Sequence, residues 1–194
     1  MIPPRLLLVD DDRLVLATTA AGLRLLGYEV TTADGSEQAL RLASTESFDL
    51  AILDIRMPSL SGVELGHLLE RRHRLRSLFL SAFGERAEVT QAIRQGALGY
   101  LRKPVDPAHM MPAIEAALAR ARDLDALAES KRQLERALAE QRRTSMAVGI
   151  VMSQRRISET AAFEHLRGEA RKQRRKLSEL CSDLVAAQQR PDHD

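Results

Sequence analysis

One decapeptide limits the possible folds of this chain more than any other stretch: residues 49–58 read DLAILDIRMP. The apolar run in its centre ends in a carboxylate, Asp54, and a proline follows at position 58. Such an uninterrupted run is typical of a parallel strand that is buried on both faces. Because Pro58 prevents regular strand pairing from continuing, Asp54 is expected at the carboxyl end of the strand. Open α/β sheets bind their ligands at that edge.

Strand patterns and helix patterns alternate through the first 120 residues. Apolar, strand-like runs lie at residues 6–9, 28–32, 48–53, 78–82 and 98–101. Helical spacing lies at residues 14–26, 36–46, 62–74 and 85–95, and again from Pro107. Ser36 is expected to cap the second helix and Asp106 the fifth. Short connections between alternating elements predict an α/β fold, a doubly wound five-stranded parallel sheet with helices on both faces.

Polar side chains follow the predicted strands, where they would share one edge of the sheet. The set comprises Asp10, Asp11, Asp54, Ser81 and Lys103. A carboxylate nucleophile, acidic ligands for a hard cation such as Mg²⁺, a hydroxyl and an ammonium together suit phosphoryl transfer. Asp54 would attack phosphorus, while Lys103 and Ser81 would bind phosphoryl oxygens. The plainer alternative is an acidic pocket neutralised by one lysine, with an aspartate capping the next helix.

Residues 5 to about 120 resemble a response-regulator receiver domain of flavodoxin-like fold. The resemblance rests on residues 9–11, 53–58 with Gly62, 81–82, 96–97 and 100–104. It implies that Asp54 accepts phosphate from a sensor histidine kinase. It implies a Mg²⁺ site made by Asp10, Asp11, Asp54 and the backbone carbonyl of Arg56. Ser81 and Tyr100 would be a switch pair that reshapes the surface of the fourth helix, fifth strand and fifth helix. The chain would then be no enzyme, with slow self-dephosphorylation of Asp54 at most.

The chain from Pro112 to about Val148 is predicted to be one helix, because strong helix formers dominate it. Four leucines fall on the a and d positions of one heptad stripe: Leu124, Leu127, Leu134 and Leu138. A sustained stripe predicts the seam of a coiled-coil homodimer. Polar residues interrupt the stripe at Lys131, Gln141 and Ser145. A single amphipathic helix that packs on its own protein is therefore the alternative.

Three helical pieces occupy the last third of the chain. One ends at residues 147–152, the second begins at Ser158 as its cap, and the third carries Leu177 and Leu184. Basic residues crowd between these pieces: Arg142, Arg143, Arg155, Arg156, Arg167, Arg171, Lys172, Arg174, Arg175 and Lys176. The acids in the same stretch are Glu159, Glu164 and Glu169. This clustering predicts a polyanion-binding surface, with a solvated charged face as the alternative.

Residues from about 134 to 187 resemble an ANTAR domain, an RNA-binding antitermination module. The resemblance rests on residues 147–152, 158–163, 166–167, 170–171 and 175–177. It implies that the module binds RNA hairpins in a nascent leader transcript and prevents a terminator from forming. The implied RNA contacts are Ala147, Gly149, Arg155, Arg156, Arg171, Lys172, Arg174, Arg175 and Lys176. Val148 and Cys181 stand where the family often has Lys and Ala, and the first change would remove one RNA contact.

The predicted organisation has four parts: a receiver domain at residues 1–120, a helical coiled-coil linker at 121–140, a small all-α three-helix RNA-binding module at 134–187, and a frayed tail at 188–194. A cytoplasmic location is expected, because Cys181 is the only cysteine and no apolar run is long enough to span a membrane. The five histidines are scattered and predict no metal site.

Two other functions stay open from the sequence. A DNA-binding response regulator would need a helix-turn-helix, whereas the basic run at residues 171–176 falls between the last two predicted helices. A signalling adaptor would bind a protein partner through the C-terminal helices, and its basic face would be incidental. A metal-dependent phosphatase is a weaker alternative, because the sequence indicates no separate substrate pocket.

Overall fold

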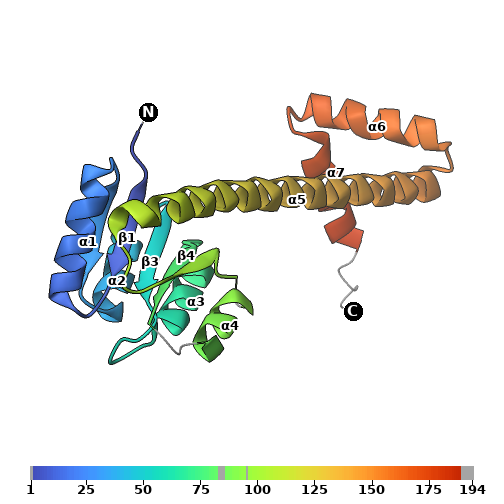
Figure 1. The fold of residues 1–194 in the computed structure, drawn as a ribbon. Helices are drawn as coiled ribbons and strands as arrows, with labels where there is room; N and C mark the ends of the chain where they lie inside the picture. The colour runs from blue at the N-terminus through green and yellow to red at the C-terminus, as the bar shows by residue number, and fades with distance from the viewer. Residues whose placement is uncertain (1, 83–85, 95, 189–194) are drawn as a thin grey trace. The chain divides into compact units, whose positions relative to one another are not determined.

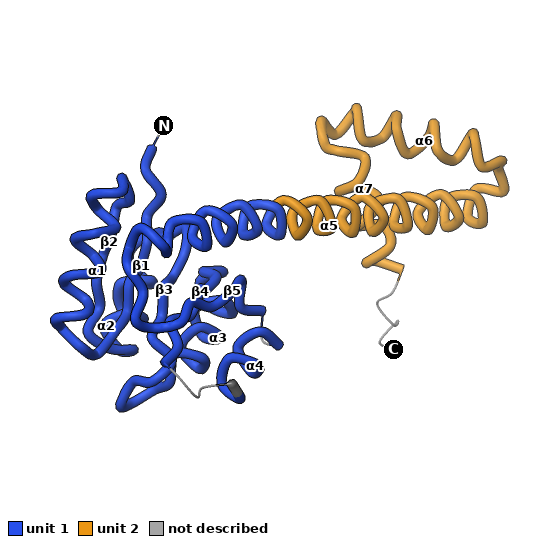
Figure 2. The backbone as a smooth tube through the Cα atoms, viewed as in Figure 1, with its two compact units in different colours: residues 1–125 blue, residues 126–194 orange. Residues whose placement is uncertain are grey.

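The computed structural model describes residues 2–82, 86–94 and 96–188. The chain divides into two compact units, residues 1–125 and 126–194, which Figure 2 colours separately. Three of the sequence-based predictions lie outside the described residues: the helix ends at Glu85 and Gln95, and the frayed tail beyond Gln188.

The first unit contains a five-stranded parallel sheet in the order β2-β1-β3-β4-β5 (Figure 1). The strands are β1 (Arg5–Val9), β2 (Glu29–Ala33), β3 (Leu50–Asp54), β4 (Ser77–Ser81) and β5 (Gly99–Arg102). All four neighbouring pairs are parallel. The strand order reverses between β1 and β3, so the carboxyl ends of these two strands flank the point where such sheets bind ligands. This confirms the predicted doubly wound fold.

Helices cover both faces of the sheet. They are α1 (Arg13–Leu25), α2 (Ser36–Thr45), α3 (Gly62–His73), α4 (Arg86–Arg94) and the beginning of α5 (Pro107–Arg155). Leu6 and Leu8 of β1 face a core shared with α1 and α5. Leu7 and Val9 alternate to the other face and join a core with α2, α3 and α4. Both faces of β1 are therefore buried, which is why its sequence shows no polar alternation.

Helix caps account for several polar residues near the sheet edge. Asp12 caps α1, because its Oδ1 accepts from the backbone N–H groups of Leu14 and Val15 at 2.9 and 3.2 Å. Asp106 caps α5 as predicted, with Ala108 N donating to its Oδ1 at 2.7 Å. The prediction for Ser36 was wrong. Gly35 holds the N-cap position without a side-chain cap, and Ser36 is buried as the first residue of α2.

The hydroxyl of Ser36 is engaged elsewhere, since its Oγ lies 3.0 Å from the Oγ of Ser59 in the loop after β3. A tertiary hydrogen bond has therefore displaced the local capping bond on which the prediction rested. The start of α3 has a capping box that the prediction lacked: Ser61 Oγ accepts from Glu64 N at 3.3 Å, and Glu64 Oε2 accepts from Ser61 N at 3.1 Å.

The second unit is built from the end of α5, α6 (Glu159–Lys172) and α7 (Leu177–Gln188). Ser158 caps α6 as predicted. The small core of the second unit includes Ala147, Val151, Leu166, Cys181 and Val185. The single helix predicted from Pro112 to about Val148 is longer than expected: α5 runs unbroken for 49 residues and includes both the linker and the first helical piece of the module. Charged residues recur throughout α5, and no helix in the described part of the chain is long and apolar enough to cross a membrane.

Close packing around Gly62 predicts that adding one methyl group there will strongly destabilise the fold. A Cβ at Gly62 would lie 1.9 Å from the carbonyl oxygen of Asp54. Gly62→Ala must push α3 away from β3, so we expect it to lower the free energy of unfolding by about 3 kcal/mol. Urea unfolding followed by circular dichroism measures this loss.

Gly168→Ala is the matched control, because a Cβ there meets nothing within 4 Å in the middle of α6. It should raise stability by about 1 kcal/mol through helix propensity alone. Equal midpoints for Gly62→Ala and the parent would show that the contact between α3 and β3 is not tight.

Candidate functional site

The carboxyl edge of the sheet gathers three carboxylates as predicted. Asp10 follows β1, Asp54 ends β3, and Asp11 lies beside them on the exposed side. One oxygen from each of the three lies within 4.8 Å of the others. A set of carboxylate oxygens at the mouth of a cleft fits a hard cation such as Mg²⁺. Asp10 and Asp54 are buried, so their charges require compensation.

Lys103 supplies that compensation from the end of β5. Its Nζ lies 2.7 Å from Asp10 Oδ2 and 2.6 Å from Asp54 Oδ1. The backbone N–H of Lys103 donates to the carbonyl of Ser81 at 2.7 Å, which fixes the lysine against β4. Burial alone would lower the pKa of Lys103, but hydrogen bonds and charges of Asp10 and Asp54 outweigh it and raise the pKa. The ammonium therefore stays charged between the two carboxylates.

The second oxygen of Asp54 is also held. The backbone N–H of Arg56 donates to Asp54 Oδ2 at 3.2 Å, so both carboxylate oxygens have donors. The Arg56 side chain reaches Glu88 on α4, with Nη2 and Oε1 3.7 Å apart. A groove of about 420 Å³ lies beside this pair and is also lined by Asp11 and Gln91. Coordination by the Arg56 carbonyl stays a prediction.

The predicted switch residues lie on neighbouring strands. Ser81 ends β4 and is buried, and its Oγ donates to the carbonyl of Leu101 at 3.5 Å. Tyr100, in β5, is 50% exposed. The aromatic ring thus lies on the outside of the sheet edge, while the hydroxyl of Ser81 is directed toward β5. The switch role of Ser81 and Tyr100 stays a prediction.

The sheet order, the edge geometry and the helical second unit define the class of protein. The chain belongs to the response regulators: the family model of the response regulator receiver domain matches residues 6–115. The model of the ANTAR domain matches residues 132–185. The chain is thus a receiver–ANTAR response regulator, which confirms both resemblances seen in the sequence.

The transcriptional regulatory protein PdtaR of Mycobacterium tuberculosis is similar over nearly the whole length. It is 29% identical over 185 residues, which cover 95% of this chain and 90% of PdtaR. A CheY-like receiver domain protein of Methanospirillum hungatei has a TM-score of 0.58 and 29% identity, over 62% of this chain and 98% of its own. A receiver domain of Clostridium thermocellum has a TM-score of 0.58 and 31% identity, with the same two coverages.

The predicted RNA contacts fall into two exposed turns and one helix. Arg155 ends α5 and Arg156 follows it in the turn before α6. The basic run 171–176 begins in the last turn of α6 and continues into the turn before α7. Ala147 does not belong with them: it is 0% exposed in the core of the second unit. Its side chain cannot reach RNA in this structure, so that prediction is corrected. The sequence could not reveal this, because a small residue fits a close approach and a tight core equally well.

Part of the basic set is already paired within the module. Lys172 Nζ lies 2.9 Å from Glu169 Oε1, and its hydrogen bond and charge lower the pKa of that carboxyl. Arg175 is paired with Asp183 of α7. Arg156, Arg171, Arg174 and Lys176 are exposed and have no side-chain partner among the residues that the structure describes. Together with Arg142 and Arg143 of α5, which are exposed and have no side-chain partner among the described residues either, these cations are available to an external anion.

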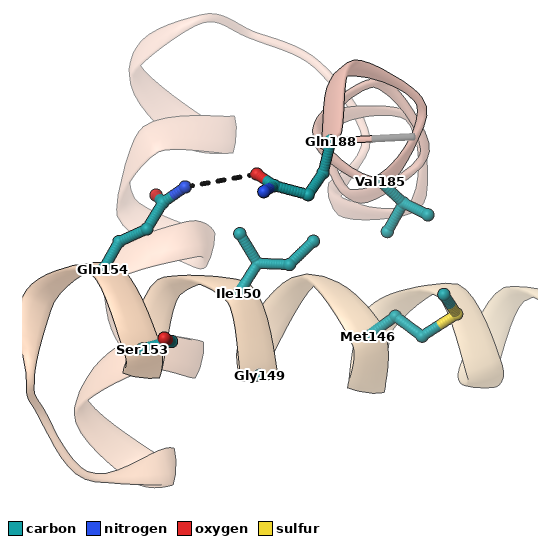
Figure 3. A pocket seen from close by; sticks show the side chains of 7 residues that line it. All are labelled: Met146, Gly149, Ile150, Ser153, Gln154, Val185 and Gln188. Atoms are coloured by element: carbon teal, nitrogen blue, oxygen red, sulfur yellow. Dashed lines mark hydrogen bonds between the residues drawn. The ribbon is translucent and has the colours of Figure 1, made fainter. Parts of the chain in front are cut away.

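A groove of about 450 Å³ lies between α7 and the end of α5 (Figure 3). Ile150, Met146 and Val185 give it apolar walls. Gln154 Nε2 donates to Gln188 Oε1 at 3.4 Å, so amide groups line one side. Gly149, a predicted contact, is exposed at this groove, and a Cβ there would meet nothing within 4 Å. The sequence missed this pairing, because Gln154 and Gln188 are far apart along the chain and carry no local signal.

The predicted dimer seam lies on α5. Leu127, Leu134 and Leu138 are 66%, 61% and 56% exposed. Leu124 is half-buried. Three large apolar side chains on one heptad stripe are thus in contact with water in the single chain.

Asp10, Asp11 and Asp12 have different partners, so replacing Asp11 should reduce Mg²⁺ binding selectively. Saturating Mg²⁺ should stabilise the parent protein, by about 2.7 kcal/mol at one hundred times the dissociation constant. Asp11→Asn should abolish most of this gain, because it removes a carboxylate from the cluster without unpairing Lys103. Thermal unfolding with and without Mg²⁺ measures the difference.

Asp12→Asn provides the control for that experiment. Asn caps helices as well as Asp does, and Asp12 is outside the carboxylate cluster. This variant should keep the Mg²⁺ effect. A full Mg²⁺ response in Asp11→Asn would exclude Asp11 as a ligand.

Proposed function

We propose that this chain is a phosphorylation-controlled transcription antiterminator of a two-component system. A sensor histidine kinase phosphorylates Asp54, and the C-terminal unit then binds RNA hairpins in a nascent leader transcript. The observation that carries the proposal is the contact of Lys103 with Asp54 inside a carboxylate cluster, in a chain whose second unit matches the ANTAR domain. We propose that this protein acts in the cytoplasm, as expected from the sequence.

The site residues suggest how the acceptor works. A carboxylate oxygen of Asp54 forms the new bond to phosphorus while the bond between phosphorus and the donor breaks. Lys103 then pairs with a phosphoryl oxygen as a point charge, and the Arg56 N–H holds the other oxygen of the Asp54 carboxylate. Asp10, Asp11 and Asp54 would hold Mg²⁺, which neutralises charge on the phosphoryl oxygens. Ser81 moves toward the phosphoryl group, and Tyr100 fills the space that this opens.

Side-chain contacts tie the first part of α5 to the rest of the receiver. Tyr28 donates its phenolic hydrogen to Glu115 Oε1 at 2.6 Å. Burial, together with Glu115, raises the pKa of Tyr28, so the phenol remains a donor. Arg76 joins Glu70 of α3 to Asp125 of α5, at 3.1 Å each. A change in the receiver is thereby passed to α5, which runs on into the second unit.

Two features favour RNA over duplex DNA as the ligand. Arg156, Arg174 and Lys176 lie in turns, whereas readout of the DNA major groove uses side chains along an inserted helix. The groove beside Gln154 and Gln188 combines apolar walls with amide groups. Unpaired bases of an RNA loop can use both, since they expose faces and hydrogen-bonding edges. A DNA-binding regulator and a protein-binding adaptor are the alternatives that the experiment must separate.

We further propose that the chain is no enzyme beyond slow hydrolysis of its own phosphoaspartate. Among the described residues, Asp10, Asp11, Asp54 and Lys103 are all assigned to holding the phosphoryl group or a cation. Loss of phosphate would then simply reset Asp54 to its ionised form.

The decisive measurement is binding of the full chain to a two-hairpin RNA, with and without a small phosphoryl donor and Mg²⁺. We expect the donor to tighten binding about tenfold, the usual size of coupling between two sites. Asp54→Asn should bind with the weak affinity whether or not the donor is present. Duplex DNA of the same sequence is the competitor. Equal, salt-sensitive binding to both nucleic acids would reduce the basic surface to non-specific electrostatics and remove the antiterminator proposal.

We also propose that the leucine stripe of α5 forms a parallel homodimer. Exposed leucines at a and d positions are stabilised when a second helix covers them. The ion pairs Lys131–Glu135 and Arg132–Glu129 lie in the same stretch of the helix and support it locally.

Leu134→Glu tests the homodimer, because it places a charge in the centre of the seam. Sedimentation equilibrium should show a dissociation constant raised at least tenfold. Leu25→Glu is the control, since Leu25 is 90% exposed on α1 and lies off the stripe. If Leu134→Glu has the same association as the parent, the stripe is not the seam.

A further inference from the structure

Two arginines of the second unit hold a backbone conformation that side chains rarely adopt. Arg156 and Arg174 both have φ of 54°, in the left-handed region. Cβ crowds the backbone there, so helices that end in this way usually place glycine at the position. Each arginine lies in a turn of the module, one before α6 and one after it.

The chain itself shows what the favoured residue is. After α6, Arg174 N donates to Arg171 O and Arg175 N donates to Ala170 O, at 3.1 and 3.0 Å. The same pair of backbone hydrogen bonds ends α1 and α4. There the left-handed residues are Gly27 and Gly96, each with φ of 94°. Arg174 thus occupies a position that the receiver fills with glycine after α1 and α4, and with an arginine, Arg74, after α3.

Nothing in the described part of the chain compensates for this strain. Arg156 and Arg174 are exposed, and neither has a hydrogen bond or ion pair from its guanidinium. Arg175, one residue further on, is by contrast paired with Asp183. Arg74, which ends α3 in the receiver, has the same backbone conformation, so the positive φ alone does not identify a contact. Arg156 and Arg174 differ from it because they lie at the two ends of one helix, in the unit where exposed basic residues are concentrated.

The two arginines lie at opposite ends of one rigid element. Helix α6 has 14 residues, which at 1.5 Å per residue separate its ends by about 21 Å. Figure 1 shows the two turns at the two ends of α6. A single phosphate or mononucleotide is too small to reach both. The span requires an extended polyanion, and a double-helical stem presents phosphates over that length.

We propose that Arg156 and Arg174 are phosphate contacts that grip the paired stem of one RNA hairpin at two points about 21 Å apart. The inference rests on the proposed RNA binding and deepens it, because it assigns these arginines to the stem rather than to the loop. It also separates them from Lys172 and Arg175, whose internal ion pairs give them structural roles.

Arg156→Gly and Arg174→Gly, made in the full chain, should lower RNA affinity without lowering the stability of the fold. Each removes the side chain and relieves the backbone, so the melting temperature should stay equal or rise. Affinity for the hairpin RNA should fall about tenfold for each variant. The slope of log K against log salt concentration should become shallower by about 1, as expected for one lost phosphate contact. Fluorescence anisotropy at several salt concentrations measures both quantities.

Arg74→Gly is the matched control. Arg74 is also an exposed arginine with positive φ, 57°, but it ends α3 in the receiver. The variant carries the same change of charge and backbone, and its RNA affinity and salt slope should equal those of the parent. An equal loss in Arg74→Gly would assign the effect to net charge and overturn the inference.

Stem length supplies a second, independent test. On a full stem, the losses in the double variant Arg156→Gly/Arg174→Gly should add. A stem cut to three base pairs is much shorter than the roughly 21 Å between the ends of α6, so only one arginine can contact it. On this stem the double variant should lose no more affinity than a single variant.

The outcomes separate the two proposals. Parent protein that binds no hairpin RNA would remove the proposed function together with this inference. Parent protein that binds RNA, with both glycine variants unchanged in affinity, would overturn the inference alone. A lower melting temperature in the glycine variants would show that the arginines stabilise the fold and would also overturn it.

Discussion

The receiver depends on the ion pairs that the half-buried ammonium of Lys103 makes with Asp10 and Asp54. Two carboxylates, Asp10 and Asp54, leave water at the same sheet edge, and each would raise the free energy of the folded state if it were unpaired. Lys103 pairs with both carboxylates, which leaves one net negative charge on the three groups, and it is itself fixed by β4 through its backbone. Three strands are therefore joined at the point where the strand order reverses. A site held together by one cation is prepared for charge redistribution, because a phosphoryl group would compete for the same ammonium. Phosphorylation would then alter the contacts among β1, β3 and β5 directly.

Much of this arrangement is predictable from the sequence, for a definite reason. The strands of a doubly wound sheet are apolar on both faces, so each one is visible as a run, and the polar residue that ends it is conspicuous. That is why Asp54 and Lys103 could be assigned to one edge although they are far apart along the chain. The sequence could not show which of the three consecutive aspartates caps α1 and which faces the site. Only the start of α1 shows that Asp12 accepts helix N–H groups, whereas Asp10 faces Lys103.

The predictions that did not hold concern residues whose surroundings come from distant parts of the chain. Ser36 has the chemistry of a helix cap, but Ser59 lies within hydrogen-bonding distance and engages its hydroxyl. Ala147 has the size for close approach to a ligand, yet α6 and α7 cover it. The left-handed backbone of Arg174 is invisible in the sequence, because propensity would place glycine there. For Ser36 and Ala147, a local rule was correct about the residue type but lacked the tertiary contact that decided its role.

The continuity of α5 has a thermodynamic consequence. Its first part is held by the receiver core through Met110, Ile114 and Leu118, and its last part by the core around Val151. Between them, residues 126–146 are almost entirely exposed. A helix of about 20 residues is marginally stable alone in water, so this middle part depends on its two anchored ends and on any helix that packs along it. How completely residues 126–146 are helical can therefore change with the contacts they make. Whatever strengthens packing along the middle of α5 makes the two units communicate as one cooperative body, and whatever weakens it lets each fold and respond independently.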